Sequence, residues 1–298
     1  MIEETPVRFV LTGSSARKLK RTHTALMAGR TRRMTLLPFC YPEISKTFDL
    51  NAYLARGGLP PAHLAPTVDE AWNELRDYAG DYLREEILAE AIVRKIEAFS
   101  RFLPIAAGSN GQLINFEAIA SDAQVPSRTV REYYSVLEDT LVGYVIQPLR
   151  FKGALSRKAI ATSKFYFFDC GALNGLLNRK SVGAATPELG NLFETWVLLE
   201  LKAFGAYRAA RDDFEIKFWR DPAGREVDFL VNDRHAIEVK ATRSVGGHHL
   251  DGIRALSAHL PLKKKWIICR EPHHRVVDGI EILPYQDFLD RLWDGELK

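Results

Sequence analysis

The sequence predicts an α/β protein with more than one domain, and three observations favour this fold class. The chain has 298 residues, a length that suggests about two or three domains. Apolar residues recur at helical spacing from Val68 to about Phe102, and two further helix patterns lie between Phe116 and Asp139. The last third alternates helix patterns with short apolar runs bounded by turn residues, which is typical of strands in an α/β domain.

The composition excludes several classes of protein. Hydrophobic residues make up 46%, and no apolar run approaches the ~18 residues that a membrane span needs. The opening stretch MIEETPVRFV lacks the pattern of a signal peptide. Lys and Arg number 41 against 38 Asp and Glu, and the net charge of +3 is too small to indicate a nucleic-acid partner by itself. Three distant cysteines without zinc spacing favour a reduced, cytoplasmic compartment: Cys40, Cys170 and Cys269.

The first segment of the chain is basic. A buried strand is predicted from Val7 to Leu11, ending in a turn with small residues. No Asp or Glu occurs between Thr5 and Tyr41, whereas Lys and Arg are frequent there. Two interpretations of this segment remain open, a solvated basic face and a surface that contacts phosphate.

A helix-turn-helix pattern occupies the middle of the chain. Helices are predicted at Phe116–Asp122 and Thr129–Asp139, and a strand follows at Leu141–Leu149. This order is the outline of a winged helix-turn-helix. In a DNA-reading version, three residues lie at the start of the recognition helix: Ser127, Arg128 and Arg131. Residues 95–150 carry 5 Lys and Arg against 6 Asp and Glu, which favours a structural or protein-contacting role over DNA contact.

The C-terminal half alternates between the two kinds of element. A strand is predicted at Phe165–Phe168, and the following Asp169 is interpreted as a helix cap rather than a site residue. A helix follows, with an apolar face made of Leu192, Trp196, Leu199 and Phe204. Strands are then predicted in FEIKFWRD, EVDFLVND, HAIEVKATRS, KKKWIICRE and GIEILPY. Two more helices are predicted, at Leu250–Leu260 and around Phe288–Trp293.

Two neighbouring strand candidates carry charged residues at matching spacing. In EVDFLV, Val227 and Phe229 are expected to share one strand face and Glu226 and Asp228 to share the other. In HAIEVK, Glu238 and Lys240 share a face. If the two strands form a hairpin, the carboxylates and the ammonium gather on one side. A plain surface ion pair, of little energetic value, is the alternative.

The convergence of these groups indicates a metal site. Acids that converge without countercharge raise each other's pKa, and a divalent cation resolves the repulsion. Mg²⁺ prefers hard oxygen ligands and typically takes one or two carboxylates plus substrate phosphate. The predicted chemistry is metal-assisted phosphodiester hydrolysis, with Mg²⁺ held by Asp228 and Glu238. Lys240 then orients the water or stabilises the pentavalent phosphate, and Glu194 on the preceding helix adds a ligand or positions a second metal.

The order of these elements resembles the restriction-endonuclease-like, or PD-(D/E)XK, nuclease core: a helix, a strand, the Asp228 strand, the Glu238-x-Lys240 strand and a helix. The sequence departs from that motif at Val227, where the motif has Pro. The resemblance implies cleavage of DNA. Residues 191–298 carry 17 Lys and Arg against 18 Asp and Glu, however, which weakens the nuclease hypothesis. A non-catalytic DNA- or protein-binding module with a relic site is the second hypothesis.

The whole chain carries a further resemblance. It rests on RFVLTGSSARKL, LMAGRTRRMTLLPFCYPEI, RGGLP, SKFYFFDCGALNGLL and LGNLFETWVLLEL. These stretches resemble a prokaryotic AAA+ ATPase family whose members join a P-loop core to a winged helix and a restriction-endonuclease-like C-terminal domain. The resemblance implies that Thr12 or Ser14 senses a γ-phosphate and that Arg30 reaches a nucleotide. The alternative interpretation of Arg30 is that it is one more residue of the solvated basic face and contacts no nucleotide.

The phosphate cradle of that family is missing from the sequence. There is no G-x-x-x-x-G-K-[ST] and no apolar strand ending in Asp-Glu before Val7, so we expect the chain to begin after both. We predict no ATP hydrolysis by this chain alone, and ATP as a cofactor only if another chain supplies the P-loop half. Such a half, DNA and further copies of the chain are the expected partners. The predicted domains are an AAA+ core remnant at 1–65, a helical region with a winged helix at 66–150, and a nuclease-like domain at 151–298.

Overall fold

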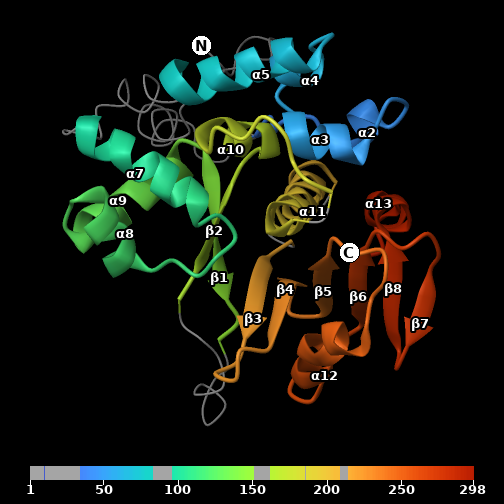
Figure 1. Ribbon diagram of the computed structural model, residues 1–298. Coiled ribbons are helices and arrows are strands. Elements are labelled where there is room, and N and C mark those ends of the chain that lie inside the picture. Colours follow the sequence, from blue (N-terminus) through green and yellow to red (C-terminus); the bar gives the residue numbers. More distant parts are fainter. Residues whose placement is uncertain (1–9, 11–33, 83–95, 151–161, 185, 209–213) are drawn as a thin grey trace, which may run out of the picture.

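The computed structural model describes the following parts of the chain: residues 10, 34–82, 96–150, 162–184, 186–208 and 214–298. They form an α/β protein in which a helical N-terminal region is followed by a mixed eight-stranded sheet with helices (Figure 1). In Figure 1, helices α7 to α9 lie beside β1 and β2, helices α2 to α5 lie above α10 and α11, and the sheet extends from β1 and β2 to the C-terminal strands. No helix in the described ranges is long and apolar enough to cross a membrane.

The strands lie in the order β2-β1-β3-β4-β5-β6-β8-β7. Three neighbouring pairs are parallel, namely β1 with β3, β5 with β6 and β6 with β8, and the other pairs are antiparallel. The bounds of the strands are β1 Gly143–Pro148, β2 Lys164–Phe167, β3 Ile216–Arg220, β4 Glu226–Val231, β5 His235–Lys240, β6 Lys264–Cys269, β7 Arg275–Val277 and β8 Ile280–Pro284.

The helices of the first half precede the sheet strands. Those of the second half lie between strands, except α13, which follows the last strand. The first set is α2 Tyr41–Ile44, α3 Leu50–Arg56, α4 Pro60–His63, α5 Val68–Asp77, the π-helix η1 Tyr78–Tyr82, α7 Ile96–Gly108, α8 Phe116–Ala123 and α9 Ser127–Asp139. The second set is α10 Cys170–Leu176, α11 Pro187–Tyr207, the 3₁₀-helix η3 Gly247–Leu250, α12 Asp251–Ser257 and α13 Tyr285–Asp294.

Helix α11 is the central helix of the fold. Its first turn is fixed by Pro187 at the first helical position and by Thr186, whose hydroxyl accepts the Leu189 N–H at 3.4 Å. The apolar residues predicted for this helix are all buried: Leu192, Trp196, Leu199 and Phe204. Full burial of one large apolar side chain contributes about 1.5–3 kcal/mol, so α11 is stabilised mainly by its packing.

The buried residues form two cores, one for each face of the sheet. The α11-side core includes Trp196, Phe229 and Ile237. The α12-side core includes Val227 and Ile253. Helices α11 and α12 therefore cover opposite faces, and the charged strands β4 and β5 run between them (Figure 1).

The helix-turn-helix order of the middle segment is confirmed. Helix α8 ends at Gln124, which adopts the left-handed conformation (φ 56°), and Pro126 precedes the first residue of α9. The second helix begins at Ser127, earlier than the predicted Thr129, because Pro126 already has the extended backbone that suits a helix N-cap. Strand β1 follows and pairs with both β2 and β3, which joins this segment to the sheet.

Strand β4 contains a β-bulge, and the prediction that Val227 and Phe229 share one face is therefore wrong. Lys217 of β3 pairs with Leu230, whereas Trp219 pairs with Val227, so β4 has one extra residue between these pairs. Val227 packs in the α12-side core and Phe229 in the α11-side core. A bulge bends the strand and redirects a side chain, and here Asp228 lies within it.

Candidate functional site

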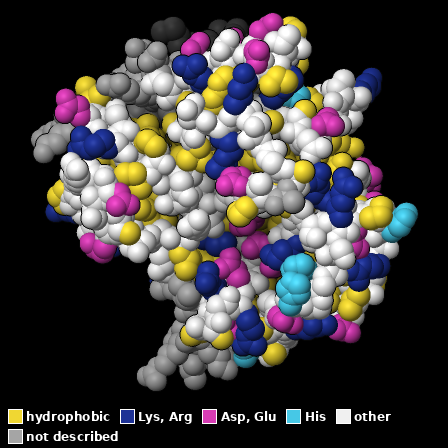
Figure 2. Space-filling model, in the orientation of Figure 1, with side chains coloured by type: hydrophobic (Ala, Val, Ile, Leu, Met, Phe, Trp, Pro, Cys, Tyr) yellow, Lys and Arg dark blue, Asp and Glu magenta, His cyan; other side chains and the backbone are white. Residues whose placement is uncertain are grey.

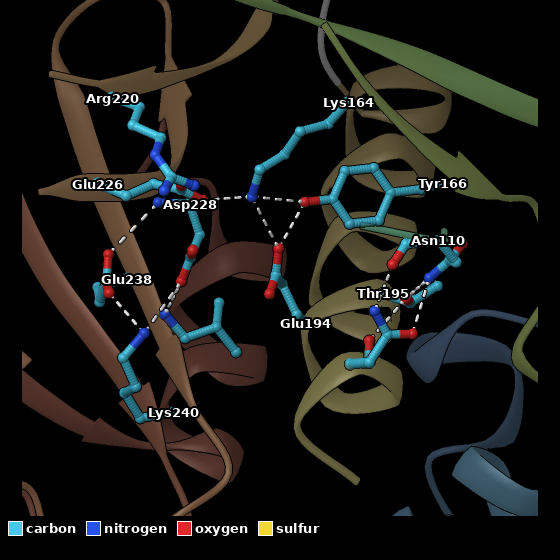
Figure 3. Close-up of polar contacts among 12 residues, drawn as sticks. Asn110, Lys164, Tyr166, Glu194, Thr195, Arg220, Glu226, Asp228, Glu238 and Lys240 are labelled. Atoms are coloured by element: carbon cyan, nitrogen blue, oxygen red, sulfur yellow. Dashed lines mark hydrogen bonds and ion pairs between the residues drawn. The ribbon is translucent and has the colours of Figure 1, made fainter. Parts of the chain in front are cut away.

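Three of the predicted site residues converge between β4 and β5. Lys240 Nζ lies 2.5 Å from Glu238 Oε1 and 3.6 Å from Asp228 Oδ2 (Figure 3). The Asp228 side chain is 7% exposed and that of Glu238 is 9% exposed, whereas Lys240 is 31% exposed. The strands bring these groups together because β4 and β5 are antiparallel neighbours, with Phe229 opposite Ile237.

Backbone hydrogen bonds fix the two carboxylates. Asp228 Oδ2 accepts the Val239 N–H at 2.8 Å, and the Asp228 N–H donates to Glu238 Oε2 at 3.4 Å. The Asp228 side chain thus accepts an N–H of β5 just beyond Phe229 and Ile237, the last pair of the β4–β5 ladder. Each carboxylate is held by the backbone of the other's strand, so their separation is restrained.

Glu194 lies in a second group of charged residues beside the first. Its Oε1 accepts a 2.5 Å hydrogen bond from the Tyr166 hydroxyl and lies 3.4 Å from Lys164 Nζ. Lys164 also forms an ion pair with Glu226, whose Oε2 is 3.0 Å from Arg220 Nη1. Helix α11 supplies Glu194, β2 supplies Lys164 and Tyr166, and the other two residues come from β4 and β3.

We call these seven charged residues the acid cluster: Glu194, Glu226, Asp228, Glu238, Lys164, Arg220 and Lys240. On the face of the molecule shown in Figure 2, acidic and basic side chains gather where β4 and β5 lie in Figure 1, with histidine side chains beside them. Four carboxylates and three cations leave the acid cluster with a formal charge near −1. The three cations of the acid cluster therefore balance most of the negative charge of its four carboxylates.

Burial and charge shift the pKa values of these groups. Burial raises the pKa of Glu238, and the nearby Asp228 raises it further, while Lys240 lowers it. Burial also raises the pKa of Glu194, against the opposing effect of Lys164. Burial alone would lower the pKa of Lys240, but the carboxylates of Asp228 and Glu238 outweigh it and raise that pKa. The ammonium therefore stays charged at neutral pH.

The donor set fits a hard divalent cation with few protein ligands. Asp228 and Glu238 offer carboxylate oxygens from adjacent strands, and Mg²⁺ commonly uses one or two carboxylates and keeps several waters. Within the described residues, no group of three or more His, Cys, Asp or Glu side chains is arranged to hold a metal ion. Glu194, for which an additional ligand role was predicted, has Lys164 and Tyr166 as its partners.

Sequence reasoning did not single out Lys164, Tyr166 or Arg220 as site residues, whereas it placed Glu226 on the same strand face as Asp228. A signal was present in the stretch KFYF, because Lys164 and Tyr166 occur at the period of two that places side chains on one strand face. Their target, Glu194, lies 30 and 28 residues away in the sequence. Only the packing of β2 against α11 brings these residues together.

The remaining predicted residues lie elsewhere. Thr12, Ser14 and Arg30 are outside the described residues. Ser127, Arg128 and Arg131 lie at the start of α9, as predicted. Arg128 Nε is 3.2 Å from Glu132 Oε1, and the Arg131 guanidinium lies 3.9 Å from the centre of the Phe116 ring.

The helix-cap interpretation of Asp169 is confirmed. Its Oδ1 accepts the Ala172 N–H at 2.8 Å, at the start of α10. Its Oδ2 accepts the Gly58 N–H at 2.6 Å, so the same carboxylate ties the RGGLP segment to α10. Both oxygens have structural partners, and burial raises the pKa of this carboxyl.

Comparison with known proteins finds family models that match two segments of this α/β chain. Residues 47–182 match the family model of a domain of unknown function, DUF8612. Residues 189–288 match the family model of a second domain of unknown function, DUF4143, which is often found C-terminal to AAA domains. No curated protein and no solved structure matches the chain. The Asp228–Glu238–Lys240 group lies in the second segment, whereas Lys164 lies in the first.

Proposed function

We propose that the C-terminal part of the chain is a Mg²⁺-dependent phosphodiesterase site that hydrolyses DNA. The observation that carries the proposal is the convergence of two buried carboxylates and one ammonium from adjacent strands. Lys240 Nζ lies 2.5 Å from Glu238 and 3.6 Å from Asp228. A surface pair without function would not require two buried acids at a bulge, because burying a charge is costly.

The residues divide the chemistry among themselves. Asp228 and Glu238 would hold Mg²⁺, which when bound polarises the phosphate and lowers the pKa of a water molecule. Lys240, which is partly exposed, can direct its ammonium toward a phosphate oxygen or orient the attacking water. Glu194 reaches the acid cluster from α11 and is proposed to add a ligand or to position a second metal.

The element order supports a finer fold assignment, which is part of the proposal. Helix α11, strands β3, β4 and β5, and helix α12 occur in the order of the restriction-endonuclease-like core. Helices α8 and α9 with β1 have the order of a winged helix. The frequent position of DUF4143 after AAA domains supports the proposal that residues 1–65 are the remnant of an AAA+ core. The other two proposed domains are the helical region with a winged helix at 66–150 and the nuclease-like domain at 151–298. ATP is proposed as a cofactor only together with a P-loop, a motif that this sequence does not contain.

A cleavage assay tests the proposed reaction. Supercoiled and single-stranded DNA are incubated with the protein and Mg²⁺ or Mn²⁺. The Lys240→Ala variant is expected to cleave on the order of 10²-fold more slowly, because it lacks the cation that stabilises the phosphate charge. Lys217→Ala is the matched control, since Lys217 pairs with Glu215 and Asp233 outside the acid cluster. Equal rates for wild type and Lys240→Ala would disprove the proposed role.

The second candidate function is a non-catalytic module that binds DNA or another protein. It is favoured by one observation, that each acid of the acid cluster already has a cationic partner within the chain. This candidate predicts that the protein either binds DNA without cleaving it or neither binds nor cleaves DNA. Homo-oligomers and a separate ATPase half are the proposed protein partners.

A further inference from the structure

Lys164 is a buried cation within the acid cluster. Its side chain is 4% exposed, and its Nζ lies 3.4 Å from Glu194 Oε1 and 3.3 Å from the Tyr166 hydroxyl. It also forms an ion pair with Glu226, and its ammonium lies 5.4 Å from the centre of the Phe218 ring. Two carboxylates and a hydroxyl thus lie around the ammonium (Figure 3), and the Phe218 ring faces it as well.

A hydrogen-bond network holds the strand of Lys164 against α11. Asn110 is 2% exposed, and its Nδ2 donates to Thr195 Oγ1 at 2.8 Å and to Asn191 Oδ1 at 2.9 Å. Its Oδ1 accepts the Phe167 N–H of β2 at 2.8 Å. Asn191 and Thr195 lie on α11, as Glu194 does, so this network fixes Lys164 relative to Glu194 (Figure 3).

The positive charge of Lys164 persists in this environment. Its ammonium lies within ion-pair distance of the carboxylates of Glu194 and Glu226, and nearby carboxylates favour the charged form of an amine. Lys164 lies in the segment that matches the first family, whereas the four acids lie in the segment that matches the second. One segment thus supplies a permanent cation to the acids of the other.

We propose that Lys164 is a built-in cation that competes with a divalent metal ion for the acid cluster, and that its removal strengthens metal binding. The inference rests on the metal site of the proposed function. A unit positive charge near the acids repels an incoming Mg²⁺, and its bond to Glu194 occupies a carboxylate that would otherwise serve as a ligand. The upstream segment therefore sets the metal affinity of the downstream site.

Calorimetric titration with Mn²⁺ alone, on the full chain, tests this inference. Lys164→Met is expected to bind Mn²⁺ at least about tenfold more tightly than wild type, because a nearby positive charge is lost. Lys164→Arg keeps the charge and is expected to bind Mn²⁺ as wild type does. Lys202→Met is the matched control, since the Lys202 ammonium lies 5.0 Å from the Tyr144 ring and has no contact with the acid cluster.

The outcomes separate this inference from the proposed reaction. If folded Lys164→Met binds Mn²⁺ no more tightly than wild type, or neither protein binds it, the inference is overturned. If Lys164→Met does not fold, Lys164→Gln carries the same test with a neutral polar side chain. DNA cleavage is measured in parallel. If Lys164→Met binds Mn²⁺ more tightly but neither wild type nor any variant cleaves DNA, the inference is supported and the proposed hydrolysis is disproved.

Discussion

Replacing Gly252 with alanine is expected to lower the free energy of unfolding by about 2–3 kcal/mol. Gly252 lies in the first turn of α12, and a Cβ added there would meet the backbone oxygen of Glu226 at 1.7 Å. No side-chain rotation relieves a contact with backbone, so α12 must move away from β4. The helix propensity of alanine, worth up to about 1 kcal/mol, offsets only part of this cost. Because β4 also carries Asp228, we expect the site to be disturbed as well.

Urea unfolding of the purified proteins measures this effect. Gly190→Ala is the matched control, because Gly190 lies in helix α11 and, among the described residues outside its own stretch of helix, none lies within 4 Å of an added Cβ. That variant is expected to be unchanged or more stable by up to about 1 kcal/mol. If Gly252→Ala is as stable as Gly190→Ala, the close approach of α12 to β4 is wrong.

Glu200 is expected to make the protein less stable as the pH rises. This carboxyl is 1% exposed, and burial raises its pKa from 4.5 to about 7. It connects three parts of the fold, since its Oε1 accepts the Tyr41 N–H at 2.9 Å and its Oε2 accepts the Trp293 Nε1–H at 3.0 Å.

The sign of the pH effect follows from the direction of the shift. A carboxyl whose pKa is higher in the folded state binds its proton more tightly when folded. Its contribution to stability is therefore complete below pH 4.5 and is lost as the pH rises through about 7. The loss amounts to about 3 kcal/mol in total, of which about 2–3 kcal/mol falls between pH 5 and pH 8.

Glu200→Gln isolates this contribution. Glutamine has nearly the same shape and no titrating proton, so the variant should gain about 2–3 kcal/mol relative to wild type between pH 5 and pH 8. Its amide accepts only one of the two N–H donors, so we expect it to be less stable than wild type at pH 5. Urea unfolding at several pH values measures the difference in free energy of unfolding between the variant and wild type. The contributions of the other titrating groups are the same in both proteins and cancel in that difference.

The control for this experiment is Glu188→Gln on the same helix. Glu188 is only partly buried, and its own backbone N–H lowers the pKa of its carboxyl below the usual 4.5. Its contribution to stability therefore changes below pH 4.5, and the difference from wild type should stay nearly constant between pH 5 and pH 8. A stability difference between Glu200→Gln and wild type that stays constant from pH 5 to pH 8 would refute the raised pKa.

The prediction of the site from the sequence was partial. The spacing of Glu238 and Lys240 on one strand, with Asp228 on the strand before, indicated that these groups would meet, and the structure brings them together. The bulge in β4 was not foreseen, because Val227 and Phe229 have the spacing of an ordinary strand. Lys164 was not foreseen either, since its only signal was a period-two pattern shared with Tyr166.

By itself, the sequence determined the order of most helices and strands after Val68, with the short strand β7 missed, and the residues that α11 buries. These features depend on interactions between near neighbours, whose periods of 3.6 and 2 can be read directly from the chain. The tertiary structure alone decided which charges share the acid cluster and which cation balances them. Such contacts join residues far apart in sequence, and they depend on how β2, α11 and β4 pack, which no local period encodes.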